Sequence, residues 1–130
     1  MCSKGSNWDD PLPDELKPRW ENWLKDLQKL QDVKVERCLK PKDIGEIQTA
    51  ELHHFSDASS QGYGQCSYIR LIGQNGVHCA LLMAKARVAP LKVVTIPRLE
   101  LTAAVVSASI SASLQKELDL NIDKEYFWTD

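Results

Sequence analysis

Three carboxylates lie in sequence settings that differ from one another. Asp57 ends an extended stretch at residues 53–57, Glu100 lies just inside the start of a long helical segment of small residues, and Asp130 closes the aromatic, strand-forming run at residues 124–129. Carboxylates that meet repel one another and normally coexist with a cation between them, and hard oxygen ligands favour Mg²⁺ or Mn²⁺. Two strand acids and one helix acid therefore suggest a metal site that assists phosphoryl chemistry.

Each of these acids also has an ordinary structural interpretation. Glu100 in the first turn of a helix would stabilise the helix dipole by ~0.3–1 kcal/mol without any catalysis. Asp57 at a strand end could cap a turn, and Asp130 could belong to a frayed terminus. Taken one at a time, the acids leave both interpretations open.

The basic residues are unevenly distributed. The chain has a net charge of −2, but residues 58–116 contain six lysines and arginines and a single acid, Glu100. One interpretation is a solvated sheet edge that lysines protect from pairing. The other is a phosphate-binding rim around an acidic metal site. Charge alone does not decide between them.

Length and composition limit the class of protein. A chain of 130 residues is one domain at most, and its 43% hydrophobic and 26% charged residues are ordinary for a globular protein. We expect no membrane span and no secretory signal, because no apolar run is long enough and none follows Lys4. The four cysteines form no Cys-x-x-Cys pair, which predicts reduced thiols in an intracellular protein rather than a zinc site.

Residues 1–45 are predicted to be a connecting segment. Residues 14–30 have apolar side chains at helical spacing, among them Trp20 and Trp23. Either the helix begins near Lys17-Pro18, where a proline in the first turn is tolerated, or Pro18 kinks it. The amphipathic helix predicted here would use its tryptophans as docking anchors. A docking module built on this helix is one functional alternative.

Residues 46–130 are predicted to form an α/β sheet. Strands at 50–57, 61–71 and 77–86 are joined by short connections, including the turn Gly73-Gln74-Asn75-Gly76, so they form an antiparallel meander. The third of these strands is apolar on both faces, which predicts a central or well-covered position. A helix at 97–118 then leads to a fourth strand at 124–129. The helical crossover places that strand parallel to the first, so that Asp57 and Asp130 approach one another.

Several motifs resemble the ribonuclease H region of retroelement polyproteins, specifically the Pao (BEL/Pao) retrotransposon type. Residues 55–59 (Phe-Ser-Asp-Ala-Ser) resemble its first catalytic strand, and residues 85–92 running into 95–101 resemble its most distinctive stretch. Residues 128–130 (Trp-Thr-Asp) resemble the strand that bears the third acid. Residues 8–13 resemble the segment that joins reverse transcriptase to ribonuclease H. The similarity covers nearly the whole chain and implies a partial ribonuclease H-like fold.

The resemblance implies roles for named residues. Asp57, Glu100 and Asp130 would be catalytic and would coordinate Mg²⁺ or Mn²⁺ for two-metal hydrolysis of the RNA strand in an RNA–DNA hybrid. Five further residues would contact the nucleic acid: Lys85, Arg87, Lys92, Arg98 and Ser59. The implied partners are the hybrid and the reverse transcriptase portion of the same polyprotein, with no small-molecule cofactor, in a cytoplasmic retroelement particle.

The sequence also departs from the family pattern. The family continues with further helices, another strand and a fourth carboxylate, so residues 46–130 would be the N-terminal part of the domain, and we expect weak or absent hydrolysis. A truncated, non-catalytic remnant with weak nucleic-acid affinity is the alternative. Related segments often bear a peptidase label, but an aspartic protease needs a glycine in its catalytic turn. Asp57-Ala58-Ser59 has none, so no protease site is predicted.

Overall fold

The structure is a computed structural model that describes residues 9–34 and 38–129. The chain divides into two compact units, Met1–Arg37 and Cys38–Asp130, which are described separately. In the first, helix α1 spans Lys17–Gln28 and continues into a 3₁₀ turn, η2, at Lys29–Asp32. The helix begins at Lys17, so Pro18 lies in its first turn, where a backbone N–H would have no helical partner in any case.

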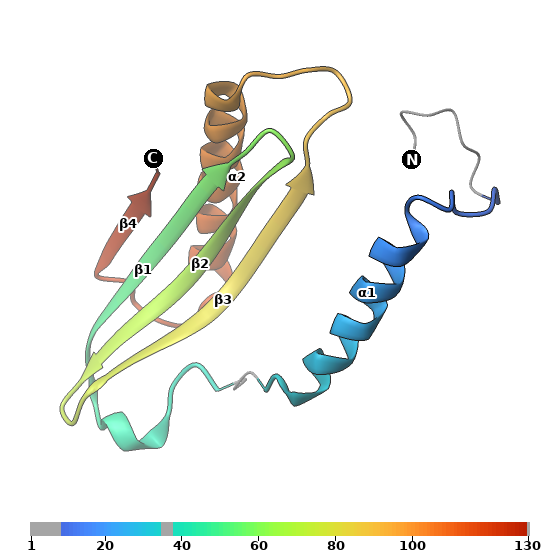
Figure 1. Cartoon of the computed structure of the whole chain (residues 1–130). Helices are drawn as coiled ribbons and strands as arrows, with labels where there is room; N and C mark the ends of the chain where they lie inside the picture. The colour runs from blue at the N-terminus through green and yellow to red at the C-terminus, as the bar shows by residue number, and fades with distance from the viewer. Residues whose placement is uncertain (1–8, 35–37, 130) are drawn as a thin grey trace. The chain divides into compact units, whose positions relative to one another are not determined.

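The second unit is a four-stranded mixed sheet with one long helix. A 3₁₀ turn, η3 (Lys42–Ile44), precedes strands β1 (Ile47–Ala58), β2 (Gly62–Gly73) and β3 (Val77–Val88), helix α2 (Ile96–Glu117) and strand β4 (Lys124–Trp128). The strand order is β3-β2-β1-β4. β1 and β2 are antiparallel, β2 and β3 are antiparallel, and β4 is parallel to β1 (Figure 1). The predicted α/β class, meander and parallel fourth strand are confirmed.

Alternation along β1 and β2 buries one face of the sheet against α2. In β1 every second residue from Ala50 to Ser56 is buried, and in β2 the same holds from Gln65 to Leu71. Successive side chains of a strand point to opposite faces, so these residues share one face. Figure 1 shows α2 running along that side of the sheet.

Small side chains let α2 approach the strands closely. Pro97 lies in its first turn, and five residues at helical spacing are buried: Leu99, Ala103, Ser107, Ile110 and Ser111. Val106 and Leu114 are apolar and also stand at helical spacing from Leu99, Ala103 and Ile110, but both are only half-buried. The buried stripe of α2 is therefore more polar than hydrophobic spacing alone indicated.

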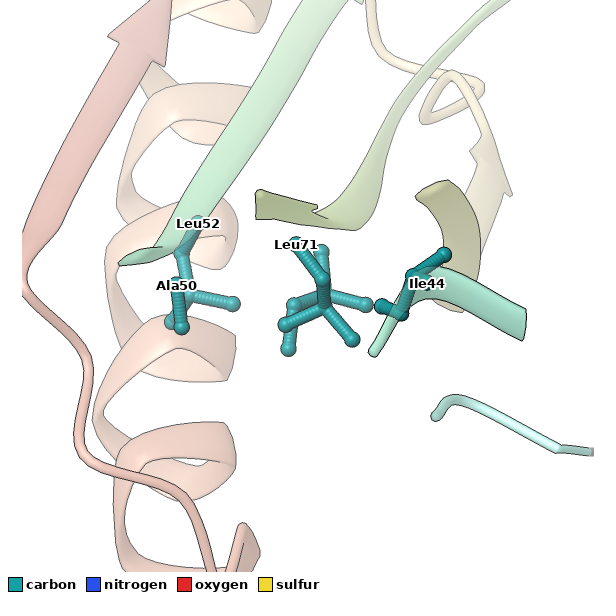
Figure 2. Close-up of a cluster of buried hydrophobic side chains, with 5 residues drawn as sticks. Ile44, Ala50, Leu52 and Leu71 are labelled. Atoms are coloured by element: carbon teal, nitrogen blue, oxygen red, sulfur yellow. The ribbon is translucent and has the colours of Figure 1, made fainter. Parts of the chain in front are cut away.

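The hydrophobic core lies at the end of the sheet nearest η3. It consists of Ile44, Ala50, Leu52, Ile69 and Leu71, and half-buried residues of β3 and of the segment between α2 and β4 pack against it. Figure 2 shows the labelled members of this cluster gathered between the strands and the helix. Gly45, with φ of 75°, turns the chain from η3 into β1.

The predicted central or well-covered position of the third strand is wrong. β3 is an edge strand, and every residue of it is exposed or half-buried. Its apolar residues also do not keep to fixed faces, because a register shift against β2 between Ser67 and Tyr68 pairs Leu81 with Tyr68 but Met83 with Ser67. Such a bulge moves every later side chain to the other face, and periodicity in the sequence does not reveal it.

Candidate functional site

An open cavity of about 750 Å³ lies where three strands end. The carboxyl end of β1, the start of β2, the end of β3 and the residues at the end of β4 line it. Asp57, Ser59 and Arg87 are three of the predicted site residues, and all three lie on its wall. The sheet topology therefore gathers an acid of β1, a hydroxyl of the turn that follows β1 and a base of β3 around one cavity.

Asp57 is the acid of this cavity. It is exposed in the second-last position of β1, and its Oδ1 accepts the Ala58 N–H at 2.6 Å. The other carboxylate oxygen has no hydrogen-bond partner within the described ranges. Asp57 thus keeps a hard oxygen available to a ligand in the cavity.

The two other predicted acids, Glu100 and Asp130, are not among the described residues that line this cavity. Glu100 is half-buried in α2 beside the buried Leu99, and it lies just past the first turn, which contains no acid, so the expected first-turn position is not found. It is not part of the cavity wall. Asp130 lies outside the described residues. In residues 9–34 and 38–129 no group of three or more histidine, cysteine or acidic side chains is placed to hold a metal ion. The three-carboxylate metal site thus stays a prediction.

The five predicted nucleic-acid contacts divide between the cavity and the segment that follows β3. Arg87 lines the cavity, and Lys85, two residues earlier on β3, pairs with Gln65 on the cavity wall. Lys92 is exposed in the segment between β3 and α2, and Arg98 is exposed in the first turn of α2. Ser59 also stabilises the turn between β1 and β2, since its Oγ donates a hydrogen bond to the Gly62 carbonyl at 3.3 Å.

The pairing of β1 with β4 is the feature that relates Asp57 to the C-terminal acid. The parallel register runs from Glu51 opposite Lys124 to Phe55 opposite Trp128. Asp57 follows Phe55 by two positions, and in the sequence Asp130 follows Trp128 by the same number.

A protein-family model covers the whole chain, residues 1–130, and its description is Pao retrotransposon-like RNaseH-like domain. The chain belongs to this family. No curated protein and no solved structure matches the chain. The resemblance inferred from the sequence motifs is confirmed at the level of the family and its RNaseH-like domain.

Within this RNaseH-like domain, a buried polar cluster around His54 was missed by sequence reasoning. His54 Nδ1 lies 2.8 Å from Ser67 Oγ, and His54 Nε2 lies 3.0 Å from Glu125 Oε1. Burial lowers the pKa of His54 below its ordinary value of 6.5, and the Glu125 carboxylate opposes this shift. No local sequence signal marks this cluster, because the acidic partner of His54 lies 71 residues away in the sequence.

The opposite face of the sheet carries stacked aromatic rings. His53 stacks on Tyr126 with centroids 4.9 Å apart, and Phe55 stacks on Trp128 at 6.0 Å. Trp128 Nε1 also donates to His53 Nδ1 at 3.2 Å. These contacts join β1 to β4 on the face away from α2. The run of three aromatic residues at 126–128 in β4 was the sequence signal for them.

Glu51 and Arg70 form an ion pair on the same face. Arg70 Nη1 donates to Glu51 Oε2 at 2.7 Å, across the antiparallel pair of β1 and β2. The hydrogen bond from Arg70 lowers the pKa of Glu51 below 4.5, although burial acts in the opposite direction.

None of the helices described has the length and apolarity needed to cross a bilayer.

Proposed function

We propose that this RNaseH-like domain contributes to metal-dependent hydrolysis of the RNA strand in RNA–DNA hybrids. The observation that supports the proposal best is the position of Asp57, an exposed acid on the wall of a cavity that also contains Arg87. The parallel pairing of β1 with β4, which ends two residues before Asp57 and two before Asp130, is the second. Family membership is the third.

The donor chemistry of the site fits a hard divalent cation. Asp57 retains an oxygen with no partner among the described residues, and Glu100 has no hydrogen bond or ion pair there. Asp57, Glu100 and Asp130 would hold Mg²⁺ or Mn²⁺, since carboxylate oxygens suit these ions. When bound, the metal would supply a polarised water and charge stabilisation for the leaving oxygen.

The basic residues would bind the substrate backbone. Arg87 on the cavity wall, with Lys85 and Lys92 nearby in sequence and Arg98 at the start of α2, would neutralise phosphates beside the acidic site. This arrangement would hold a scissile phosphate next to Asp57 while the remaining backbone follows the cations. The proposed partners are the hybrid and the reverse transcriptase portion of the same polyprotein.

A divalent-ion titration followed by amide NMR tests the metal site. We expect Mg²⁺-dependent shifts grouped around Asp57, Glu100 and Asp130, and we expect Asp57→Asn to remove them. Asp119→Asn is the matched control, because Asp119 is exposed in the segment between α2 and β4. Shifts scattered instead over acids of the first unit, such as Asp14, would contradict the proposal.

Cleavage of a labelled RNA–DNA hybrid tests the chemistry. Whatever rate the wild-type chain supports, we expect Asp57→Asn and Glu100→Ala to reduce it by more than about 100-fold, because even outer-shell partners of metal ligands contribute about 10–100-fold. Asp119→Asn should leave the rate unchanged. Hybrid binding without Mg²⁺-dependent cleavage would favour the alternative, a non-catalytic nucleic-acid-binding remnant.

A further inference from the structure

We propose that His54 and Glu125 are positioning residues at the centre of a buried hydrogen-bonded clamp, and the proposal rests on the function proposed above. The clamp joins β1, α2 and β4, the elements that carry or lead toward the three predicted carboxylates. His54 lies on β1, three residues before Asp57, and Glu125 lies on β4, the strand that leads toward Asp130. Ser111 lies on α2, the helix that contains Glu100.

Hydrogen bonds of the clamp connect four elements. His54 lies between Ser67 Oγ of β2, at 2.8 Å, and Glu125 Oε1 of β4, at 3.0 Å. From α2, Ser111 Oγ donates to Glu125 Oε1 and Gln115 Nε2 donates to Glu125 Oε2 at 3.0 Å. Glu125 is therefore the point where β1 and α2 both hold β4.

Burial makes these hydrogen bonds hard to replace. His54 is 1% exposed, Ser67 is fully buried and Ser111 is 3% exposed, so water has little access to their polar atoms. A buried polar group that loses its partner retains the full cost of desolvation. Glu125 is also half-buried while every other residue of β4 is exposed. On the α2 side of β4, Glu125 makes the hydrogen bonds, and Phe127 stacks on His54 with ring centroids 4.8 Å apart.

The pattern of donors and acceptors gives the clamp two proton arrangements. Ser67 Oγ donates a hydrogen bond to Gln65 Oε1 at 2.9 Å, so it accepts a hydrogen bond from His54 Nδ1–H. An ionised Glu125 accepts a second hydrogen bond, from His54 Nε2–H. Both ring nitrogens then carry hydrogen and His54 is cationic. If the Ser67 hydroxyl and the Gln65 amide turn round, the same contacts are satisfied by a neutral imidazole.

Glu125 is the partner of His54 in either arrangement. The charged and titratable groups that act on His54 are Glu125 and His53, because the members from β2 and α2 are Ser67, Gln65, Ser111 and Gln115, which do not titrate. Gln65 also lines the cavity that contains Asp57. The clamp thus extends from α2 through β4 and β1 to the wall of the candidate site.

Site-resolved amide exchange of the whole chain tests the clamp. We expect Glu125→Gln to accelerate exchange in β4 by about tenfold, as loss of a buried hydrogen bond allows local opening. Exchange in β2, which is paired on both sides, should remain unchanged. Glu117→Gln, an exposed site at the end of α2, is the control. Unchanged exchange in β4, or equal acceleration across the sheet, would overturn the proposal.

Ser111→Ala is a second variant, and it removes one of the two hydrogen bonds from α2 to Glu125. It should accelerate exchange in β4 to a smaller extent, and Ser109→Ala should not, because Ser109 is exposed and donates to the Val105 carbonyl within its own helix. The imidazole nitrogens of His54 give an independent readout. Since Glu125 raises the pKa of His54, Glu125→Gln should lower that pKa further, and an unchanged pKa would contradict direct coupling.

The positioning role is tested with Mg²⁺ alone. If wild type shows the grouped Mg²⁺ shifts, Glu125→Gln should weaken Mg²⁺ affinity by about 10–100-fold, as partners outside the metal ligands do. Equal affinity in the two proteins would overturn the positioning role. Faster exchange in β4 of the variant, with no Mg²⁺-dependent shifts in wild type, would overturn the proposed function and retain the clamp.

Discussion

Neighbouring residues of β1 perform different tasks because their side chains alternate between the two faces of the sheet. His54 faces α2 and enters the buried clamp, whereas His53 faces away and stacks on Tyr126 and Trp128. Glu51, on the same face as His53, pairs with Arg70. Two adjacent histidines thus have unlike surroundings, and burial lowers the pKa of His54.

The ion pair of Glu51 with Arg70 leads to a pH-dependent prediction. Because Arg70 lowers the pKa of Glu51 below 4.5, the pair contributes stability above that pH and loses it as the pH falls through the lowered pKa. We expect Arg70→Gln to reduce the free energy of unfolding at neutral pH, and the difference from wild type to shrink on acidification.

Urea denaturation in steps between neutral pH and about pH 3 measures this difference. Lys116→Gln is the control, because Lys116 is an exposed cation at the end of α2. A difference between Arg70→Gln and wild type that stays constant across this range would show that the carboxylate of Glu51 is not responsible.

Among the elements, the bounds of the four strands and of α2 were predictable from sequence. β1 and β2 were predicted to within three residues at each end, β3 to within two, and α2 and β4 to within one. The position of β3 at the edge was not predictable, since its apolar residues suggested two covered faces and its bulge leaves no signature in composition. The polar contacts of His54 were equally hidden, because they depend on β4 and α2 meeting β1 in three dimensions.

The connection between β2 and β3 gives a prediction about one glycine. A Cβ on Gly73 would collide with the carbonyl oxygen of Ile44, which belongs to η3 beneath the turn. Gly73→Ala should therefore lower the free energy of unfolding by about 1–3 kcal/mol, the usual cost of overpacking. Thermal and urea denaturation would measure the change.

Gly76 provides the matched comparison in the same turn. A Cβ at Gly76 meets no atom within 4 Å, so Gly76→Ala should be neutral or stabilise by up to about 1 kcal/mol. Equal destabilisation by both substitutions would indicate that the turn needs glycine flexibility at each position and would contradict the steric explanation.

For the molecule as a whole, every buried hydrophobic residue that the structure describes belongs to the second unit. These residues run from Ile44 to Ile110, and α1 contributes none. The hydrophobic cluster lies at the η3 end of the sheet, whereas the cavity with Asp57 lies at the other end of β1. The polar clamp therefore supports a part of the sheet that the apolar cluster does not reach.

Leu52 tests the contribution of the core to stability. It is fully buried in the cluster, so Leu52→Ala should reduce the free energy of unfolding by about 2–5 kcal/mol. Leu101→Ala, at a position that is 66% exposed on α2, should change it by less than about 0.5 kcal/mol. Similar losses in the two variants, measured by urea denaturation, would contradict the assigned core.

The parallel pair of β1 and β4 has a consequence for the order of folding. Its partners are far apart in the chain, as in Glu51 and Lys124, whereas β1, β2 and β3 are joined by short connections. Closing a long loop costs entropy before any contact compensates for it, so non-local pairing is slow. In pulse-labelling during refolding, amides of the meander should become protected first and those of β4 last, which leaves the outer edge of β1 transiently open to a strand from another molecule.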